Sequence, residues 1–554
     1  MTTAITSRSR ATSRRWWILA VLCLSVLLAV VDNTIVNVAL PTMSRTLSAS
    51  TQDLQWIVDA YTLVFAGLLI VGGNLGDRLG RRRVLQAGLA LFALTSVAAA
   101  LSRTTGELIA SRAAMGVAAA LIYPATLALL TNVFTDARER ATAIGIWSGV
   151  SGLAVAIGPV TGGLLLRHFS WSSVFYVNVP LVIIALAAGM RLLPESRDPK
   201  AGRFDPLGAV ASIAGVGLLV WTVIEAPRHG WASATTIAGF AGSLVILAAF
   251  VGWQLRRPDP MLDVRLFRNP RFSAASGAIA LAFFGLFGFI FLITQYFQVV
   301  LSYDPLRAGV ATLPFAVVTG LVSPAAIALM KRLGTKAVVT IGLALMSAGF
   351  VVAAGTSVDS AYWGRIITAM VLIAAGLALT ASPATEAIMG ALPPSKAGVG
   401  SAVNDTTREL GGTLGVAIVG SVMSSAYSSH VLSALDKIGA PAALTSAAQQ
   451  SVTAGMHAAA YLPPGLRGVA AAAARQAFVA GLHNGSLVAA GATALAALAT
   501  LAFLPARVRP PAAAPPARVR RPAAARPAPA QSQASGPEAS GRHAASQPAA
   551  VRAR

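Results

Sequence analysis

Long apolar segments recur along the chain, and the shorter stretches between them hold most of the polar residues. Most of these segments have about 20 residues or more, which is the length at which a helix crosses a hydrocarbon core of about 30 Å. We predict fourteen membrane-spanning helices from this pattern. Their ranges are 16–40, 54–76, 84–102, 107–131, 140–166, 171–193, 206–226, 234–253, 272–300, 309–330, 336–355, 362–390, 399–426 and 484–504. The pattern therefore predicts an all-α polytopic membrane protein.

Part of this pattern occurs twice. The stretch YPATLAL at Tyr123–Leu129 matches SPATEAI at Ser382–Ile388, and the same offset brings Gly152 onto Gly411. The fourth and fifth predicted helices thus repeat as the twelfth and thirteenth. Transporters that work by alternating access are commonly built from such repeated halves. We therefore predict two six-helix bundles with two further helices inserted between them.

The repeat sets the predicted parts of the chain. They are a cytoplasmic N-terminus at 1–15, a first bundle at 16–193, two inserted helices with flanking loops at 194–271, a second bundle at 272–504 with an outer loop at 427–483, and a disordered basic tail at 505–554. The tail is rich in Pro, Ala, Arg and Ser and lacks the apolar residues that a core requires. Its arginines fit either contact with anionic lipid headgroups or a solvated tail.

Composition and charge agree with a membrane protein. The 554 residues are 55% hydrophobic and 11% charged, whereas a soluble protein has about 25% charged residues. The net charge of +23 could indicate nucleic-acid binding. If the N-terminus is cytoplasmic, however, most of the 43 Lys and Arg residues fall on the cytoplasmic side of the predicted spans. We expect a multi-pass protein of the cytoplasmic membrane with both termini in the cytoplasm, in contact with lipids and not with nucleic acid.

The loop between the second and third predicted helices reads GGNLGDRLGRRRV, Gly72–Val84. Its glycines permit a tight turn, and its arginines favour the cytoplasm. The order of residues resembles the signature loop of the major facilitator superfamily, G-x-L-x-D-R-x-G-R-R, which latches the cytoplasmic gate in that family. The resemblance implies a gating role for Gly73, Asp77, Arg78, Gly80 and Arg81.

The fifth predicted helix contains GLAVAIGPVTGG, Gly152–Gly163. Small residues let a neighbouring backbone approach closely, and proline removes one helix hydrogen bond. The pattern resembles the motif that shapes the interface between the halves of drug and proton antiporters, and VDNTIVNVALP at Val31–Pro41 resembles their first-helix motif. With fourteen helices, the chain resembles the drug:H+ antiporter-2 family, of the EmrB/QacA type, over 16–504. The antiporter motif residues are Gly152, Gly158, Pro159, Gly162 and Gly163.

Few acids lie in or near the apolar segments. They are Asp32, Asp59, Glu225, Glu386, Asp405 and Glu409. A charge in the middle of the bilayer costs roughly 3 kcal/mol on insertion scales, so such residues usually have a function. A carboxyl group in an apolar setting binds a proton more readily than in water, as a reversible proton carrier must. We assign Glu225 to the membrane interface, and Asp59 fits either a capping or packing acid or a functional one.

Asp32 lies towards the outer end of the first predicted helix, with Asn33, Thr34 and Asn37 after it. Either these neighbours satisfy the carboxylate or it binds a proton or cation, and we favour the second.

Two charged residues lie in the fourth predicted helix and its repeat. Arg112 has the position at which the resembling family carries a functional arginine, although it could also extend to the interface. Glu386 follows Pro383, and its repeat partner is Leu127. The first half has a leucine at this position, so helix packing does not require an acid there in the second half.

Three charges lie together in the thirteenth predicted helix. Spacings of three and four residues put Arg408 and Glu409 on the same face as Asp405, so Arg408 is expected to reach Asp405 directly and to lie beside Glu409. One carboxylate remains in excess. The cluster is either a self-neutralised structural element or an element that couples proton binding to transport.

The sequence predicts a secondary active transporter and not an enzyme. We expect a monomeric antiporter that admits protons and expels an amphipathic, cationic or neutral organic compound, with no cofactor and no metal. No G-x-x-x-x-G-K-[ST] loop occurs, which argues against ATP hydrolysis. The alternatives are an exporter of an endogenous metabolite, another solute transporter on the same fold, and a membrane sensor or scaffold that does not transport.

Overall fold

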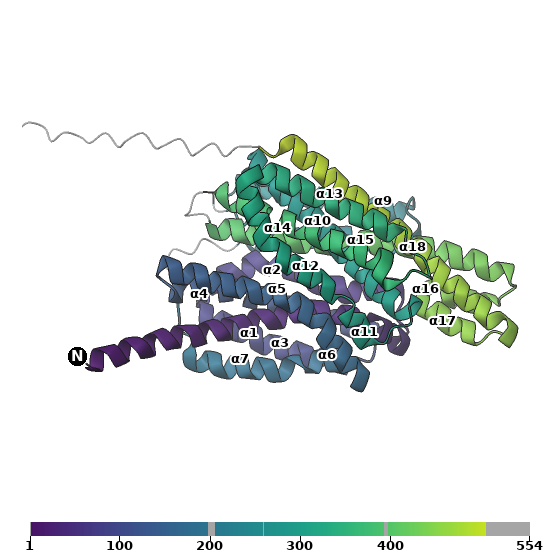
Figure 1. The fold of residues 1–554 in the computed structure, drawn as a ribbon, viewed down its shortest axis with the longest axis horizontal. Helices are drawn as coiled ribbons and strands as arrows, with labels where there is room; N and C mark the ends of the chain where they lie inside the picture. The colour runs from purple at the N-terminus through teal and green to yellow at the C-terminus, as the bar shows by residue number, and fades with distance from the viewer. Residues whose placement is uncertain (1, 198–204, 259, 393–396, 506–554) are drawn as a thin grey trace, which may run out of the picture. The chain divides into compact units, whose positions relative to one another are not determined.

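The computed structural model describes residues 2–197, 205–258, 260–392 and 397–505, which form helices joined by short connections (Figure 1). The first helices are α1 (Thr2–Leu47), α2 (Thr51–Leu79), α3 (Arg81–Leu101), α4 (Thr105–Val133), α5 (Ala137–His168), α6 (Ser173–Tyr176) and α7 (Asn178–Leu192). Two helices follow, α8 (Pro206–His229) and α9 (Ala234–Arg256). The remainder consists of η1 (Val264–Arg268), α10 (Pro270–Gln295), η2 (Tyr296–Val300), α11 (Pro305–Val310), α12 (Leu313–Leu333), α13 (Thr335–Ala354), η3 (Tyr362–Ile366), α14 (Ile367–Gly390), α15 (Ala397–Lys437), α16 (Ala442–Gln450), α17 (Val452–Ala460) and α18 (Pro464–Phe503).

Thirteen of the described helical segments are long and apolar enough to cross a membrane. α5 takes the place of the remaining predicted span, and its described apolar stretch, Leu153–His168, is shorter. The predicted all-α membrane fold is confirmed.

Several predicted boundaries differ from the structure. α1 begins at Thr2 instead of 16, and α18 begins at Pro464 instead of 484. The predicted outer loop at 427–483 is largely helical, because α15 continues to Lys437 and α16 and α17 follow it. The physical reason is its alanine content, since alanine has the highest helix propensity. The predicted disordered tail lies outside the described residues from 506 onwards.

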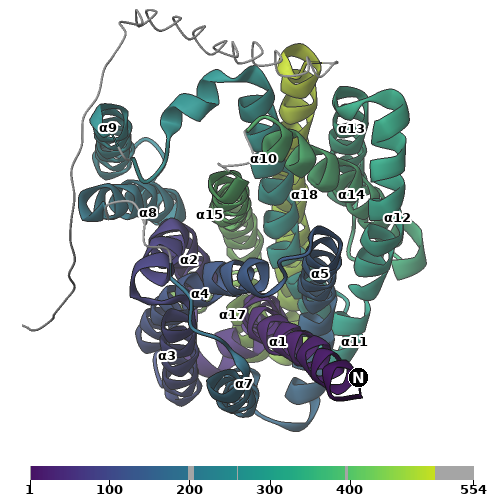
Figure 2. The ribbon, with the colours of Figure 1, turned by 90° about the vertical axis from the view of Figure 1, so that its left-hand side faces the viewer.

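The long helices pack in two groups (Figures 1 and 2). In the first group, α4 packs against α2 and α3, and α1 packs against α5 and α7. In the second group, α10 packs against α15 and α18, and α13 packs against α14 and α18. The inserted helices α8 and α9 pack against each other, and α8 contacts both α2 and α15. The inserted pair therefore lies beside the junction of the two groups, while the predicted residue bounds of the bundles stay a prediction.

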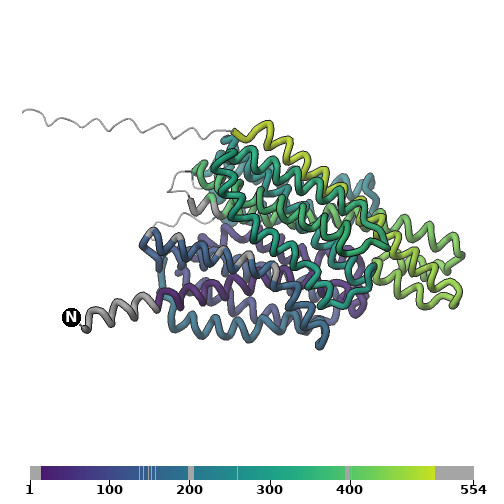
Figure 3. The backbone as a smooth tube through the Cα atoms, viewed as in Figure 1, coloured from purple at the N-terminus to yellow at the C-terminus, as the bar shows by residue number. Residues whose placement is uncertain are grey.

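Successive long helices run in alternate directions, as the backbone trace shows (Figure 3). The turn from α2 to α3 lies at one end of the bundle, which we call the Arg81 end. The turn from α16 to α17 lies at the other end, which we call the Ser451 end. Hydrogen bonds join the two groups towards the Ser451 end. They include Ser44 Oγ to Ser451 Oγ at 3.3 Å and Thr51 Oγ1 to the Gln450 carbonyl at 3.0 Å.

The α8–α9 pair is closed at the Arg81 end by Asp205, whose side chain is 1% exposed. It caps α8 by accepting the Gly208 N–H, and it also accepts from Trp253 and from Gln254 Nε2 at 2.8 Å. Arg257 Nη1 lies 3.4 Å from Asp205 Oδ1. Burial alone would raise the pKa of Asp205, but these hydrogen bonds and the Arg257 charge outweigh it and hold the pKa below its ordinary value.

Asp205→Asn should lower the thermal unfolding midpoint of the purified protein at neutral pH. Hydrogen bonds to a charged group contribute about 1.5–3 kcal/mol each, and the amide loses part of that contribution. Because the folded pKa is lowered, the stabilisation is complete above the ordinary aspartate pKa of about 4 and is lost as the pH falls through the lower folded value. The difference between variant and wild type should therefore shrink on acidification. Asp136→Asn, at the exposed N-cap of α5, is the matched control and should have a smaller effect. Equal effects of the two substitutions would contradict the assignment.

Candidate functional site

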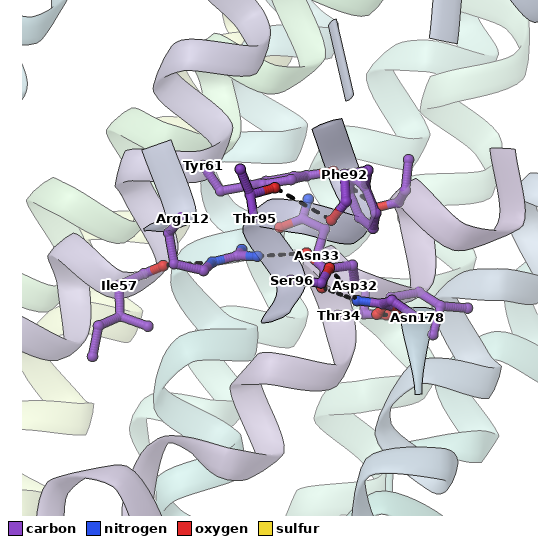
Figure 4. Close-up of polar contacts among 12 residues, drawn as sticks. Asp32, Asn33, Thr34, Ile57, Tyr61, Phe92, Thr95, Ser96, Arg112 and Asn178 are labelled. Carbon is purple, nitrogen blue, oxygen red and sulfur yellow. Dashed lines mark hydrogen bonds and ion pairs between the residues drawn. The ribbon is translucent and has the colours of Figure 1, made fainter. Parts of the chain in front are cut away.

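A buried ion pair between α1 and α4 forms the centre of the first group of helices (Figure 4). Arg112 Nη1 lies 2.5 Å from Asp32 Oδ2, and both side chains are 0% exposed. The structure thus brings together two residues that the sequence singled out separately. The alternative that Arg112 extends to the membrane interface is wrong, because its side chain points into the bundle.

Three further groups hold this pair in place. Asn178, at the start of α7, donates from Nδ2 to Asp32 Oδ1 at 2.8 Å. Arg112 Nε donates to the carbonyl oxygen of Ile57 at 3.0 Å, and the guanidinium carbon lies 4.3 Å from the centre of the Tyr61 ring. Each carboxylate oxygen of Asp32 therefore has its own partner. Asn178 and Tyr61 were not predicted as site residues, because both lie far from Asp32 along the chain and no local pattern marks them.

The polar neighbours of Asp32 on α1 do not satisfy its carboxylate. Thr34 donates to the carbonyl oxygens of Val30 and Val31, and Asn37 donates to that of Asn33. The partners come from α4 and α7 instead.

The Asp32–Arg112 pair suits a carboxyl group that exchanges a proton. While Asp32 is charged, Arg112 neutralises it within the bundle. When a proton neutralises Asp32 instead, Arg112 is left as a buried cation without its partner, and breaking a buried pair in this way costs about 3–5 kcal/mol. Arg112 Nη2 already has no hydrogen-bond partner among the described residues. The stability of the contact between α1 and α4 therefore depends on whether Asp32 carries a proton.

The glycines of α5 bring it close to both groups of helices. A Cβ atom at Gly158 would collide with Thr34 Oγ1, and one at Gly162 would lie 2.8 Å from Ile35 Cγ1. Both contacts are on α1, within one turn of Asp32. On another face of α5, a Cβ atom at Gly163 would lie 2.5 Å from the carbonyl oxygen of Pro305 in α11. α5 therefore connects the Asp32 helix to the second group.

Pro159 and Gly152 are the two remaining residues of the α5 motif. A Cβ atom on Gly309 of α11 would collide with the carbonyl oxygen of Pro159, so this proline lies at the same junction. Gly152 lies on α5, and its surroundings are outside the described part of the structure.

The predicted gate residues lie at the Arg81 end. Arg81 Nη2 lies 2.8 Å from Asp77 Oδ1, and Gly80 between the two helices has φ 111°, a conformation that favours glycine. Gly73 packs on α4, where its Cβ would lie 3.5 Å from Pro124 Cβ, and Arg78 lies in the last turn of α2.

Glu195, which follows α7, also binds this turn and is not among the predicted gate residues. Its Oε1 accepts the Arg82 N–H at 3.2 Å, and its Oε2 lies 3.7 Å from Arg83 Nε. The contacts described for the gate loop are thus within the first group.

The predicted direct contact between Arg408 and Asp405 on α15 is wrong. Arg408 Nη2 donates to Thr385 Oγ1 of α14 at 3.2 Å, and its guanidinium carbon lies 5.2 Å from the centre of the Phe283 ring of α10. Between these described residues there is no ion pair of Arg408 with Asp405 or Glu409. The reason is tertiary packing, which offers Arg408 partners on two other helices.

The acids of this cluster are also only partly satisfied. Asp405 Oδ1 accepts from Asn404 at 3.4 Å, and Glu409 Oε2 is buried without a partner among the described residues. The cluster is therefore a group of three charges that do not form the predicted self-neutralised unit.

Glu386 and Glu225 are less enclosed than Asp32. The Glu386 side chain is 53% exposed, and its Oε2 lies 3.9 Å from Arg271 Nη2 at the Arg81 end. Glu225 lies 3.5 Å from Arg228 near the end of α8. Among the described residues, no group of three His, Cys, Asp or Glu side chains could hold a metal ion.

Apolar helices in two packed groups, with a charge-balanced pair inside one group, define a polytopic membrane transporter. The chain belongs to the Major Facilitator Superfamily, whose family model matches residues 22–416. It is a transporter and not an enzyme.

Curated relatives cover most of the chain. The Multidrug efflux pump LfrA of Mycolicibacterium smegmatis is 40% identical over 82% of this chain and 90% of its own length. The Methyl viologen resistance protein SmvA of Salmonella typhimurium is 38% identical over 76% and 84%. The Tetracenomycin C resistance and export protein of Streptomyces glaucescens is 34% identical over 76% and 78%.

A solved structure has the same fold. A bacterial homologue of the human lysosomal transporter Spinster, in an inward-facing and unoccupied conformation, matches with a TM-score of 0.59 at 20% identity. The match covers 88% of this chain and 98% of that chain.

Gly163→Ala should destabilise the contact between α5 and α11. The added methyl group would meet Pro305 O at 2.5 Å and Leu306 Cα at 2.6 Å, which are backbone atoms that cannot rotate away. Overpacking of this kind costs about 1–3 kcal/mol, so the thermal unfolding midpoint of the purified protein should fall. Gly149→Ala on the same helix is the matched control, because nothing lies within 4 Å of its added Cβ. A midpoint as high for Gly163→Ala as for Gly149→Ala would contradict the close contact.

Proposed function

We propose that this protein is a proton-coupled exporter of amphipathic, cationic or neutral organic compounds, including drugs and antibiotics. The observation that carries the proposal is the buried Asp32–Arg112 pair on a helix that packs against α5, which in turn contacts the second group. The names of the relatives, a multidrug efflux pump, a methyl viologen resistance protein and an antibiotic export protein, support the substrate class.

Coupling starts at Asp32. A proton that binds Asp32 releases Arg112, and the resulting change at the α1–α4 contact passes to α5 through Thr34 and Ile35. Since α5 also touches α11, the change reaches the junction between the groups. Competition between the proton and a substrate for the same charge balance links inward proton flow to outward substrate flow. The proton gradient drives the cycle without a bound cofactor, and the monomer is the working unit.

The Lys and Arg distribution supports the orientation that we propose, with both termini in the cytoplasm and the chain in the cytoplasmic membrane. The Arg81 end is then cytoplasmic and the Ser451 end is external. The hydrogen bonds between the groups near Ser451 correspond to a conformation closed to the outside.

A second candidate function is the export of one endogenous metabolite. The relative named for resistance to and export of tetracenomycin C favours it, because that name specifies a single compound. A broad panel of amphipathic cations separates the two functions, since a dedicated exporter should transport few or none of them.

Asp32→Asn should abolish proton-driven export while the protein still inserts into the membrane. The amide keeps the shape of the side chain but cannot exchange a proton, and it leaves Arg112 unpaired. The measurement is efflux of ethidium, a fluorescent amphipathic cation, from proteoliposomes with an imposed pH gradient, with and without a protonophore.

Glu225→Gln is the control for this prediction, because it removes an acid that pairs with a neighbour on its own helix. It should keep wild-type efflux. Undiminished gradient-driven efflux by Asp32→Asn would refute the role of Asp32.

A further inference from the structure

One face of α2 carries a polar stripe that the transport mechanism above does not use. Gln52, Gln55, Asp59 and Thr62 follow spacings of three, four and three residues, which place them on the same side of a helix. All four are buried, and Asp59 is 0% exposed. The stripe faces α15, so it belongs to the junction between the two groups of helices.

Hydrogen bonds connect this stripe to α15 on both sides of Asp59. Gln52 Nε2 donates to Ser424 Oγ at 3.3 Å, and Gln55 Nε2 donates to the Ala417 carbonyl at 2.9 Å. Thr413 Oγ1 donates to Thr62 Oγ1 at 2.9 Å. We call this contact, between Gln52–Thr62 of α2 and Thr413–Ser424 of α15, the α2–α15 seam.

Asp59 is the exception within the seam. Both of its carboxylate oxygens are buried and neither has a hydrogen-bond partner among the described residues. A carboxylate buried without a partner is far more costly than its protonated form. The closed seam therefore accommodates Asp59 best when the residue carries a proton.

Among the described residues, no charged group forms an ion pair with Asp59. α8 covers the seam with apolar side chains, where Val220, Val223 and Ile224 pack with Leu63 of α2 and Ala417 of α15. The charged groups on the helices around α2 have other neighbours. Asp32 pairs with Arg112, Glu225 pairs with Arg228, Arg408 binds Thr385, and Tyr61 on α2 itself donates to Ala29. Asp405 accepts from Asn404, and no contact joins Glu409 to Asp59 in the described residues.

We propose that Asp59 is a second protonation site of the transport cycle and that its proton permits the α2–α15 seam to close. The inference rests on the proposed function for the direction of the cycle. In the outward-open state the seam separates, Asp59 meets water from the outside and its charged form is stable. Proton uptake from the outside removes that charge and lets Gln55 and Thr62 bond again with α15. Asp59 thus acts as a latch that returns the empty carrier to the closed form.

The test measures how far the two groups of helices separate at their external ends, without substrate or gradient. Spin labels are placed on cysteines at Arg45 and Lys437, exposed residues at the external ends of α1 and α15, with Cys23→Ala in the background. Pulsed electron resonance then gives the distance between the labels in lipid nanodiscs as a function of pH. In the otherwise unchanged protein, the population with a long distance should rise with pH, by up to about tenfold per pH unit for one coupled proton.

Asp59→Asn should remain at the short distance across the whole pH range, because its side chain cannot become charged. Asp59→Leu, which replaces the polar group by an apolar one, should also remain at the short distance. It replaces Asp59→Asn in the test if that variant folds poorly. Asp436→Asn, an exposed acid on α15, is the matched control and should follow the unchanged protein. A pH response in both Asp59 variants equal to that of the unchanged protein, or no pH response in the unchanged protein, would overturn the proposal.

The outcome is separable from the proposed function. Failure of gradient-driven ethidium efflux in the wild type would count against proton-coupled export. The pH dependence of the distance between the spin labels would still decide whether Asp59 controls closure. Loss of the pH response in Asp32→Asn together with its retention in Asp59→Asn would assign the latch to Asp32 and refute the proposal for Asp59.

Discussion

The ion pair between Asp32 and Arg112 is the interaction on which the rest of the site depends. In a low-dielectric bundle neither charge is tolerated alone, so α1 and α4 must stay in contact for as long as both groups are ionised. The partners of the pair extend this constraint. Asn178 ties it to α7, and the Ile57 carbonyl and the Tyr61 ring tie it to α2. One buried pair thus fixes the relative positions of four helices.

Small residues then transmit this arrangement across the molecule. The absence of side chains at Gly158 and Gly162 lets α5 lie directly on Thr34 and Ile35, next to the ion pair. The absence of one at Gly163 lets the same helix touch the backbone of α11. A movement of α1 of a few tenths of an ångström cannot be absorbed in such contacts, because closely packed interiors transmit strain.

The sequence predicted what depends on local pattern and composition. Apolar length gave the spans, and the spacing of glycines marked α5. The scarcity of acids singled out Asp32, and a family position singled out Arg112. It did not predict that these two residues bind each other, nor that Asn178 and Tyr61 complete the site, because those contacts join residues remote in the chain. Local spacing was misleading for Arg408, whose neighbours on α14 and α10 outcompete Asp405. The helices α16 and α17 were missed because their alanine-rich stretches lack the length of a span.

The internal repeat shows why the two halves have different chemistry. Pro124 of α4 and Pro383 of α14 occupy corresponding places inside their helices, so the repeat extends to the kink-forming residues. The same register places Val371 at the position of Arg112, so the second half has no arginine at that site. In the same alignment, Asp405, Arg408 and Glu409 of α15 correspond to Ile146, Gly149 and Val150 of α5. The first half therefore holds a balanced pair that a proton can disturb, and the second half holds charges that its own helices leave incompletely satisfied. The two halves therefore share helix positions and prolines but carry different charges at corresponding positions.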